Sequence, residues 1–239
     1  MTEKITVDDI ECSVRRTERR SLAISVERNG TATVSAPNKT DIQVIEQFIK
    51  SKGLWLRQKL AHKSETNREK IKRGFVNGQG FLYLGKSYRL KLMRNGDNGV
   101  GNVNDINQLR LYQGYFELPE SERLTAREHF IKWYKRQTEQ QLKLRISRYD
   151  KRIGVRVNNV KVSELGNRWA SCGKNGTLYF NWRTVMAPIW VFDYILVHEL
   201  VHMVEKGHKK NFWHLIAQAM PDYGEHIAWL QEHGVELDI

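Results

Sequence analysis

Cysteine is scarce in this chain of 239 residues, which contains Cys12 and Cys172 alone. Two cysteines so far apart give no disulfide framework, which excludes the small secreted domains that depend on one. Long apolar runs are also missing, since none approaches the roughly 18 residues that a membrane span needs. The first nine residues lack the basic and then apolar build of a signal peptide. We therefore expect a cytoplasmic protein with no membrane partner.

A glycine-rich phosphate loop is absent as well. Gly78, Gly80 and Gly85 do not have the spacing of such a loop. No Lys followed by Ser or Thr ends the segment at the right place. The sequence therefore disfavours nucleotide binding in this region.

Positive charge is plentiful but unevenly distributed. Lysine and arginine number 39 against 27 acidic residues, a net charge of +12. Residues 123–183 carry 15 basic and 4 acidic residues, or +11, whereas residues 184–239 carry 3 and 8, or −5. A basic body beside an acidic segment suggests a nucleic acid or another polyanion as partner. A solvated basic helix that keeps the protein soluble explains the pattern equally well.

The N-terminal half has the pattern of an antiparallel β-rich domain with one long helix. Residues 5–36 are rich in β-branched residues on both sides of Asn29-Gly30, which predicts a hairpin. An amphipathic helix, capped by Thr40 or Asp41, is expected to continue to about residue 63 with a bend at Gly53. Further strands are expected from Phe81 onward, and we predict a first domain over residues 1–118.

The C-terminal half has the pattern of a helical domain with a small sheet. Pro119–Tyr149 is predicted to form a long basic helix, and Ile153–Val162 a strand. A hairpin is expected over Asn167–Arg183, and Pro188 then opens another helix. The chain as a whole is thus predicted to be α+β, with its second domain over residues 119–239.

The helix after Pro188 carries the pattern His198-Glu199-Leu200-Val201-His202. Side chains four residues apart lie on one face of a helix, so both histidines can bind one metal ion. Glu199 lies about 100° round the axis, within reach of a water on that metal without being a ligand. A further histidine, His208, follows Gly207 at a workable distance. Cys172 could be a nucleophile or ligand, but with no second cysteine nearby we interpret it as a small buried strand residue.

Several motifs together resemble the YgjP-like metallopeptidases, a family of predicted metal-dependent hydrolases with a zincin, SprT-like core. The similarity rests on Arg168-Trp-Ala-Ser-Cys172, Leu178–Arg183, Ala187-Pro188, Asp193-Tyr194, His198–His202, His208 and Phe212-Trp213. Weaker likeness in the N-terminal half extends it over nearly the whole chain. The sequence departs from the family at Ala170, where Gly is usual, and at Lys209, where a small residue is common.

The resemblance implies a zincin-like C-terminal half in which zinc is bound by His198, His202 and His208. It also implies Glu199 as the general base. Other third ligands remain conceivable, namely Glu225, as in proteases that use a later glutamate, and His214 or His226. His214, however, falls off the apolar stripe of its predicted helix.

Three neutral imidazoles leave a fourth tetrahedral position for water, as in catalytic zinc sites. Zinc lowers the pKa of such a water to about 7, and Glu199 could pass its proton to the leaving amine of a peptide. Tyr223, His226 or Arg168 could supply a second electrophile. We expect an extended peptide or protein substrate to add as a strand along Thr177–Trp182.

Two other functions fit the same residues. A metal-dependent phosphohydrolase acting on nucleotides would suit the basic helix. A basic protein that binds nucleic acid and holds a structural metal would show an affinity falling steeply with salt. The sequence leaves the physiological substrate and the oligomeric state open.

Overall fold

The computed structural model describes residues 3–27, 30–66, 74–94 and 108–239. The chain divides into two compact units, residues 1–70 and 71–239. The domain boundary expected between residues 118 and 119 falls inside the second unit. The physical reason is a shared aromatic core, because Phe81 and Phe116 from before that point pack against Phe130 and Trp133 from after it.

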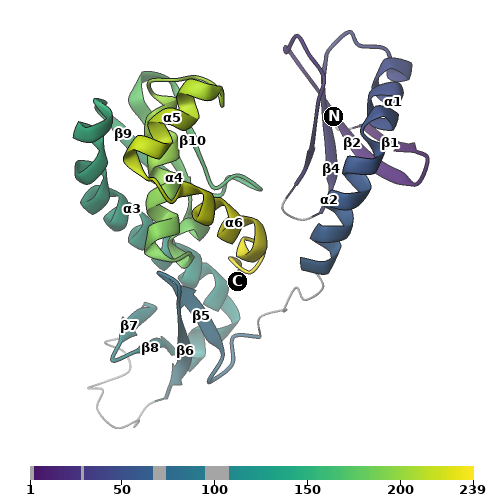
Figure 1. The fold of residues 1–239 in the computed structure, drawn as a ribbon. Coiled ribbons are helices and arrows are strands. Elements are labelled where there is room, and N and C mark those ends of the chain that lie inside the picture. The colour runs from purple at the N-terminus through teal and green to yellow at the C-terminus, as the bar shows by residue number, and fades with distance from the viewer. Residues whose placement is uncertain (1–2, 28–29, 67–73, 95–107) are drawn as a thin grey trace. The chain divides into compact units, whose positions relative to one another are not determined.

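The described part of the first unit is a four-stranded sheet with two α-helices, which can be followed in Figure 1. Its sheet order is β1-β2-β4-β3, with β2 and β4 parallel and the other pairs antiparallel. The sheet is therefore mixed and not the antiparallel one expected. The predicted hairpin is confirmed as the β3–β4 pair, although Arg28 and Asn29 in its turn lie outside the described residues. The elements are β1 (Glu3–Val7), β2 (Ile10–Thr17), β3 (Ala23–Val26), β4 (Ala32–Pro37), α1 (Ile42–Ser51) and α2 (Gly53–Thr66).

Alternation along β2 builds the core of this unit. Ile10, Cys12 and Val14 are buried, and the residues between them face outward or are half-buried. Ile45 and Ile49 of α1 complete the core. Asp41 caps α1 by accepting a hydrogen bond from the backbone N–H of Gln43 at 2.8 Å, and the expected bend is a break between two helices at Lys52.

The second unit begins with another mixed sheet, followed by a long helix. Its order is β5-β6-β8-β7, and β6 pairs with β8 in parallel. The helix begins after a short 3₁₀ segment, Glu120–Thr125, and ends at Gly154, whose φ of 76° closes it in the left-handed conformation. The elements are β5 (Gly80–Tyr83), β6 (Lys86–Met93), β7 (Arg110–Tyr112), β8 (Tyr115–Pro119) and α3 (Ala126–Ile153).

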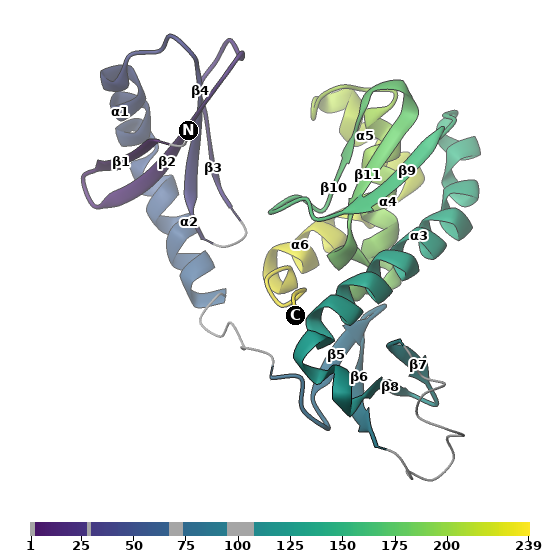
Figure 2. The same ribbon diagram turned by 180° about the vertical axis from the view of Figure 1, so that it is seen from behind.

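A three-stranded sheet, three α-helices and the short 3₁₀ helices Lys174–Gly176 and Trp182–Met186 complete the unit, part of which is seen in Figure 2. Helix α4 is central and packs against α3, α5, α6 and β10. The sheet order is β10-β11-β9, so β11 is the middle strand. The prediction that Thr177–Trp182 forms a free edge is thus wrong, because β9 returns to pair with β11 in parallel and leaves β10 at the edge. The elements are β9 (Asn159–Ser163), β10 (Ala170–Cys172), β11 (Thr177–Asn181), α4 (Ile189–His202), α5 (Lys210–Ala219) and α6 (Tyr223–His233).

Two contacts fix the position of α4. The turn between β5 and β6 donates backbone hydrogen bonds from Leu84 to Val185 O at 2.8 Å and from Gly85 to Met186 O at 3.0 Å, just before α4 begins. Farther along, Asp193 of α4 accepts hydrogen bonds from Arg145 at 2.8 Å and Tyr149 at 3.0 Å, both on α3. Burial raises the pKa of Asp193 although Arg145 and Tyr149 oppose the shift. The helix that carries the histidine motif is therefore held from two sides in its N-terminal half.

Among the described residues, no helix combines the length and apolar character needed to cross a membrane. The α+β class is confirmed, with a β-rich N-terminal part and helices concentrated toward the C-terminus.

Candidate metal centre

Three histidine rings meet at the C-terminal end of α4. The Nε2 atoms of His198 and His202 lie 3.2 Å apart, and that of His208 lies 3.0 and 3.1 Å from them. His208 reaches them from the loop after α4, which brings the three ligand atoms to one point. The sequence-predicted metal residues are thus brought together by the fold.

The ring contacts around the cluster leave each Nε2 pointing inward. His202 donates from Nδ1 to the carbonyl of Glu205 at 3.1 Å, so its neutral ring keeps the lone pair on Nε2. The hydroxyl of Tyr194 lies 3.4 Å from Nδ1 of His198. Phe212 is fully buried and its ring centroid lies 4.6–4.9 Å from all three imidazoles, which forms an apolar support beneath them.

Two of the three histidines have a lowered pKa, which favours their neutral form. Burial, with His202 and His208 adding to it, lowers the pKa of His198 to about 3. Burial and the charge of His202 also lower the pKa of His208. Neutral imidazoles are the form that binds metals.

The spacing of the nitrogens fits a tetrahedral ion. Ligands at 2.0–2.1 Å from zinc in tetrahedral directions stand about 3.3 Å from one another, as zinc geometry requires. The observed separations of 3.0–3.2 Å are close to this. Imidazole nitrogens are suitable ligands for zinc, as they are for copper, iron and nickel. These residues therefore fit a zinc ion.

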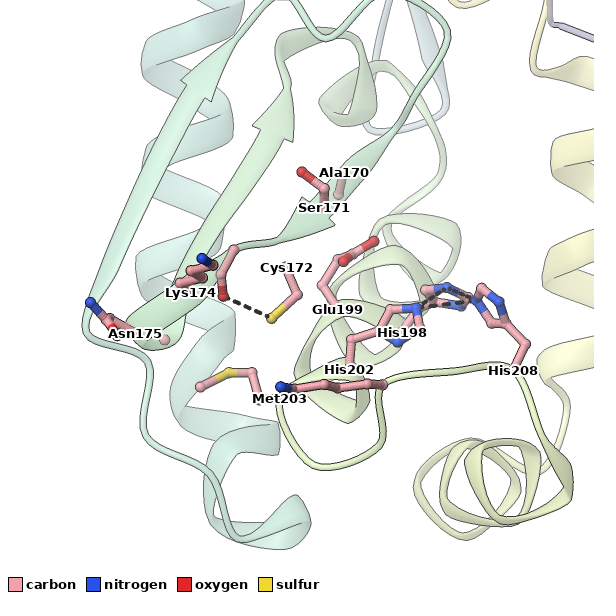
Figure 3. A pocket seen from close by; sticks show the side chains of 13 residues that line it. Ala170, Ser171, Cys172, Lys174, Asn175, His198, Glu199, His202, Met203 and His208 are labelled. Atoms are coloured by element: carbon pink, nitrogen blue, oxygen red, sulfur yellow. Dashed lines mark hydrogen bonds between the residues drawn. The ribbon is translucent and has the colours of Figure 1, made fainter. Parts of the chain in front are cut away.

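Glu199 is buried beside the cluster and outside it. Figure 3 shows its side chain between the strand residues Ala170–Cys172 and the histidines. Burial raises the pKa of Glu199 to about 7, although a hydrogen bond from the backbone N–H of Cys172 and the charge of Arg168 oppose the shift. Its Oε2 atom is buried and has no hydrogen-bond partner among the described residues. One oxygen of the Glu199 carboxylate is thus hydrogen-bonded to β10, and the other has no hydrogen-bond partner among the described residues.

A cavity of about 890 Å³ opens over these groups. The edge strand and the loop after it form one wall, and α4 with its following loop forms the other (Figure 3). The lining residues are Ala170, Ser171, Cys172, Gly173, Lys174, Asn175, Gly176, His198, Glu199, His202, Met203, Lys206 and His208. The arrangement can hold an extended ligand against a metal and a buried carboxylate.

The alternative ligands weighed from the sequence lie outside the cluster. His214 is exposed on α5 and hydrogen-bonds Gln218 at 3.1 Å. His226 packs against Tyr194 and Trp190. Glu225 lies in the first turn of α6 and is exposed. None of the three belongs to the converging group found in the described part of the chain.

The geometry does not identify which residue would act as a second electrophile toward a substrate carbonyl. Tyr223, His226 and Arg168 do not line the cavity, and of these Arg168 alone influences the pKa of Glu199. Cys172 lines the cavity and is half-buried, and burial followed by the charge of Glu199 raises the pKa of its thiol. A raised pKa disfavours a nucleophilic thiolate, which agrees with its interpretation as a strand residue.

Some contributors were missed from the sequence. Tyr194 stands four residues before His198, a spacing that places both on one helix face and could have revealed it. Phe212 was named as part of a family motif but given no role, and Lys174 and Lys206 gave no local signal, since only the folded chain brings them to the site.

The YgjP-like metallopeptidase domain matches residues 20–233, which is most of the chain. The chain belongs to the YgjP-like metallopeptidase family. No curated protein matches it significantly. Among solved structures, the metallopeptidase zymogen of Pyrococcus abyssi abylysin is similar at 22% identity, over 37% of this chain and 87% of that one. Its TM-score of 0.32 is too low for that likeness to carry a structural argument.

The elements of the candidate site lie in the second unit, and the YgjP-like match covers them together with part of the first unit. The matched residues include the edge strand β10, the motif helix α4 and the loop with His208. The family supports a metallopeptidase, and with it a metal-dependent hydrolase.

Proposed function

We propose that this protein is a zinc-dependent peptidase in which His198, His202 and His208 hold the metal. The observation that carries the proposal is the convergence of three imidazole Nε2 atoms beside a buried carboxylate, one oxygen of which has no partner among the described residues. Three protein ligands leave room for a fourth, which is the arrangement of catalytic zinc sites. When bound, zinc supplies Lewis acidity, which polarises a carbonyl and makes a water molecule acidic near neutral pH.

Glu199 acts as the general base in this proposal. Its pKa of about 7 in the metal-free chain would fall next to a divalent cation, which keeps the carboxylate ionised at neutral pH. The unpartnered Oε2 atom can then accept a proton from water and later give it to the leaving amine. The backbone N–H of Cys172 holds the other oxygen, so the carboxylate is oriented toward the cavity.

The edge strand β10 offers a surface for an extended peptide. The backbone N–H of Gly173 donates to Thr177 O, and the backbone N–H of Asn181 donates to Trp169 O, each at 2.8 Å. The backbone groups of Trp169 and Gly173, at odd-numbered positions, therefore face β11. The peptide groups of Ala170 and Cys172 must then point away from β11, because the direction alternates along a strand. Strand addition at such an edge gives main-chain affinity for peptides of many sequences. Peptide is therefore the proposed substrate class.

The proposal is tested by one substitution with a matched control. We expect Glu199→Gln to bind zinc as the wild type does and to lower kcat/KM for peptides by about 100- to 10,000-fold, the usual contribution of a general base. Glu225→Gln removes an exposed carboxylate outside the cluster and should leave the rate unchanged.

The assay also separates the competing functions. Purified protein is offered unfolded protein, short peptides and nucleoside triphosphates under one set of conditions. Hydrolysis of triphosphates that requires Glu199, without peptide cleavage, would replace the peptidase by a phosphohydrolase. Full peptide turnover by Glu199→Gln would remove the proposed base.

A further inference from the structure

The charged groups of the cavity have a second pattern beyond the metal cluster. Of its lining residues, Lys174 and Lys206 carry ammonium groups, and Glu199 carries the carboxylate. Lys174 follows the edge strand β10, and Lys206 lies in the loop between α4 and His208. The two lysines thus reach the same cavity from opposite walls.

Neither lysine is neutralised by the described part of the chain. Lys174 and Lys206 are exposed, and no hydrogen bond or ion pair joins either one to a described residue. The neighbouring carboxylate of Glu205 instead accepts a hydrogen bond from Asn211 at 3.1 Å. Glu199 is buried with one oxygen bonded to the backbone of β10. The positive charges that line the cavity are therefore available to a ligand.

The distribution of lysine in the sequence points to the same place. Residues 184–239 carry a net charge of −5, and their three lysines are Lys206, Lys209 and Lys210. All three flank His208, although the rest of this segment is acidic. Exposed lysines are commonly solvated and without function. Lys206 differs from Lys209 and Lys210 in that it lines the cavity, where it joins Lys174 from the other wall.

Shape decides which anion suits this site. The lysines border a cavity of about 890 Å³ with the edge strand β10 on one side, which suits an extended chain. Figure 3 shows Lys174 on the side of Cys172 away from the histidines, so a charge bound there lies beside the reacting bond and not on it. A side-chain carboxylate of a peptide held along β10 meets this requirement.

We propose that the cavity selects peptides with an aspartate or glutamate near the scissile bond, on the side that faces Lys174 and Lys206. This inference rests on the proposed peptidase function and names its substrate class. Each exposed ion pair contributes up to about fivefold in binding, so two lysines give a preference of about three- to tenfold in kcat/KM for an acidic over a basic residue. The preference falls as the ionic strength rises, because exposed charges are screened.

The test compares matched peptides with matched variants. A peptide mixture first locates the cleavage sites of the wild type, and quenched fluorescent peptides with Glu, Gln or Lys at each flanking position are then assayed. The ratio of kcat/KM for Glu against Lys peptides is measured for the wild type, Lys174→Glu, Lys206→Glu and the double variant. Lys151→Glu, on the exposed surface of α3, makes the same change in net charge outside the cavity.

We expect the ratio to exceed one at positions on one side of the bond, to fall below one in the double variant, and to stay at the wild-type value in Lys151→Glu. Equal rates for Glu and Lys peptides, or a ratio that the double variant leaves unchanged, overturn the substrate preference while the peptidase function stands. Absence of any peptide cleavage that depends on Glu199 overturns both. Retained zinc content in each variant shows that a changed ratio does not come from a damaged site.

Discussion

At the level of single residues, neighbouring groups fix the orientation of the imidazole rings in the candidate site. The Glu205 carbonyl fixes the tautomer of His202, and Phe212 contacts all three imidazole rings. Trp213 donates from its indole N–H to the carbonyl of His208 at 3.1 Å and stacks on its ring, which holds the exposed third histidine in place. The cluster is therefore preorganised before a metal binds.

His208→Ala should abolish stoichiometric zinc binding. Loss of a partner that merely orients a ligand costs 10- to 100-fold in affinity, so loss of a ligand is expected to cost more than about 100-fold. Elemental analysis and a competition titration with a chromophoric chelator measure the change. His214→Ala is the matched control, because His214 is exposed and its ring bonds Gln218 instead of the cluster. If His208→Ala still held one zinc per chain while His214→Ala lost it, the assignment of the third ligand would be wrong.

The pair His198 and His202 could be predicted from helical periodicity alone, since both signals lie within one turn of one helix. His208 was a candidate because it follows the motif at a workable distance, but its choice as the third ligand followed from the resemblance to the family, because a loop residue has no periodicity to place it. Lys174 and Lys206 are 32 positions apart and meet through the packing of α4 on β10. No local pattern could have joined them.

At the level of elements, hairpins were predictable where their turns are short, and strand neighbours were not. Glycine stands at the turns at Gly85 and Gly114, and both residues adopt φ near +80°, which glycine allows without strain. The sequence led us to place the free edge on β11, whereas the structure has it on β10. The parallel partner of β11 is β9, which comes from an earlier part of the chain and leaves no pattern in β11 itself. Strand periodicity gives a strand its faces but not its neighbours.

Gly85→Ala should destabilise the second unit more than Gly114→Ala does. Both changes place a side chain at positive φ, which costs about 1 kcal/mol. A Cβ at Gly85 would in addition lie 2.9 Å from Cα of Pro188, at the start of α4, whereas a Cβ at Gly114 meets nothing within 4 Å. Since overpacking costs about 1–3 kcal/mol, we expect a total loss of about 2–4 kcal/mol at Gly85.

Urea denaturation of the two variants gives their free energies of unfolding. Equal losses for Gly85→Ala and Gly114→Ala would show that the contact between the β5–β6 turn and α4 does not constrain the motif helix.

At the level of the whole molecule, both four-stranded sheets share one connectivity. The orders β1-β2-β4-β3 and β5-β6-β8-β7 are the same, and each sheet is followed by helix. The sequence indicated the α+β class but not this repetition, because the parallel pairs β2–β4 and β6–β8 leave no local trace. The boundary drawn at residue 118 separated the second sheet from α3, which buries its aromatic face. Nucleic-acid binding by the basic residues 123–183 and a cytoplasmic location stay predictions.

Long-range ion pairs tie the end of the chain to the small sheet. Arg183 is buried and bonds Glu164, and it also donates to Asp238 at 2.9 Å. Burial would raise the pKa of Glu164, but the hydrogen bond and charge of Arg183, together with donors from Trp182 and Gly166, outweigh it and hold that pKa below its ordinary value. A carboxylate with a lowered pKa stabilises the fold above its unfolded pKa and loses that effect as the pH falls through its folded value.

Glu164→Gln should therefore lower the free energy of unfolding at pH 7 and have less effect in acid. About half of the Glu164 side chain is exposed, so we discount the effect for solvent screening to about 1 kcal/mol at pH 7. The difference from the wild type should shrink as the pH falls below about 4, near the reference pKa of glutamate. Glu139→Gln, exposed on α3, serves as the control, and denaturant titrations over a pH series make the measurement. A difference independent of pH would contradict the assignment.

The most direct test of the central claim is the rate of peptide hydrolysis as zinc is returned to chelator-stripped protein. The account predicts no hydrolysis without metal, a rate that rises until one zinc is bound per chain, and no recovery in Glu199→Gln although that variant binds one zinc. Hydrolysis that persists after the metal has been removed, or that Glu199→Gln recovers with zinc, would contradict it.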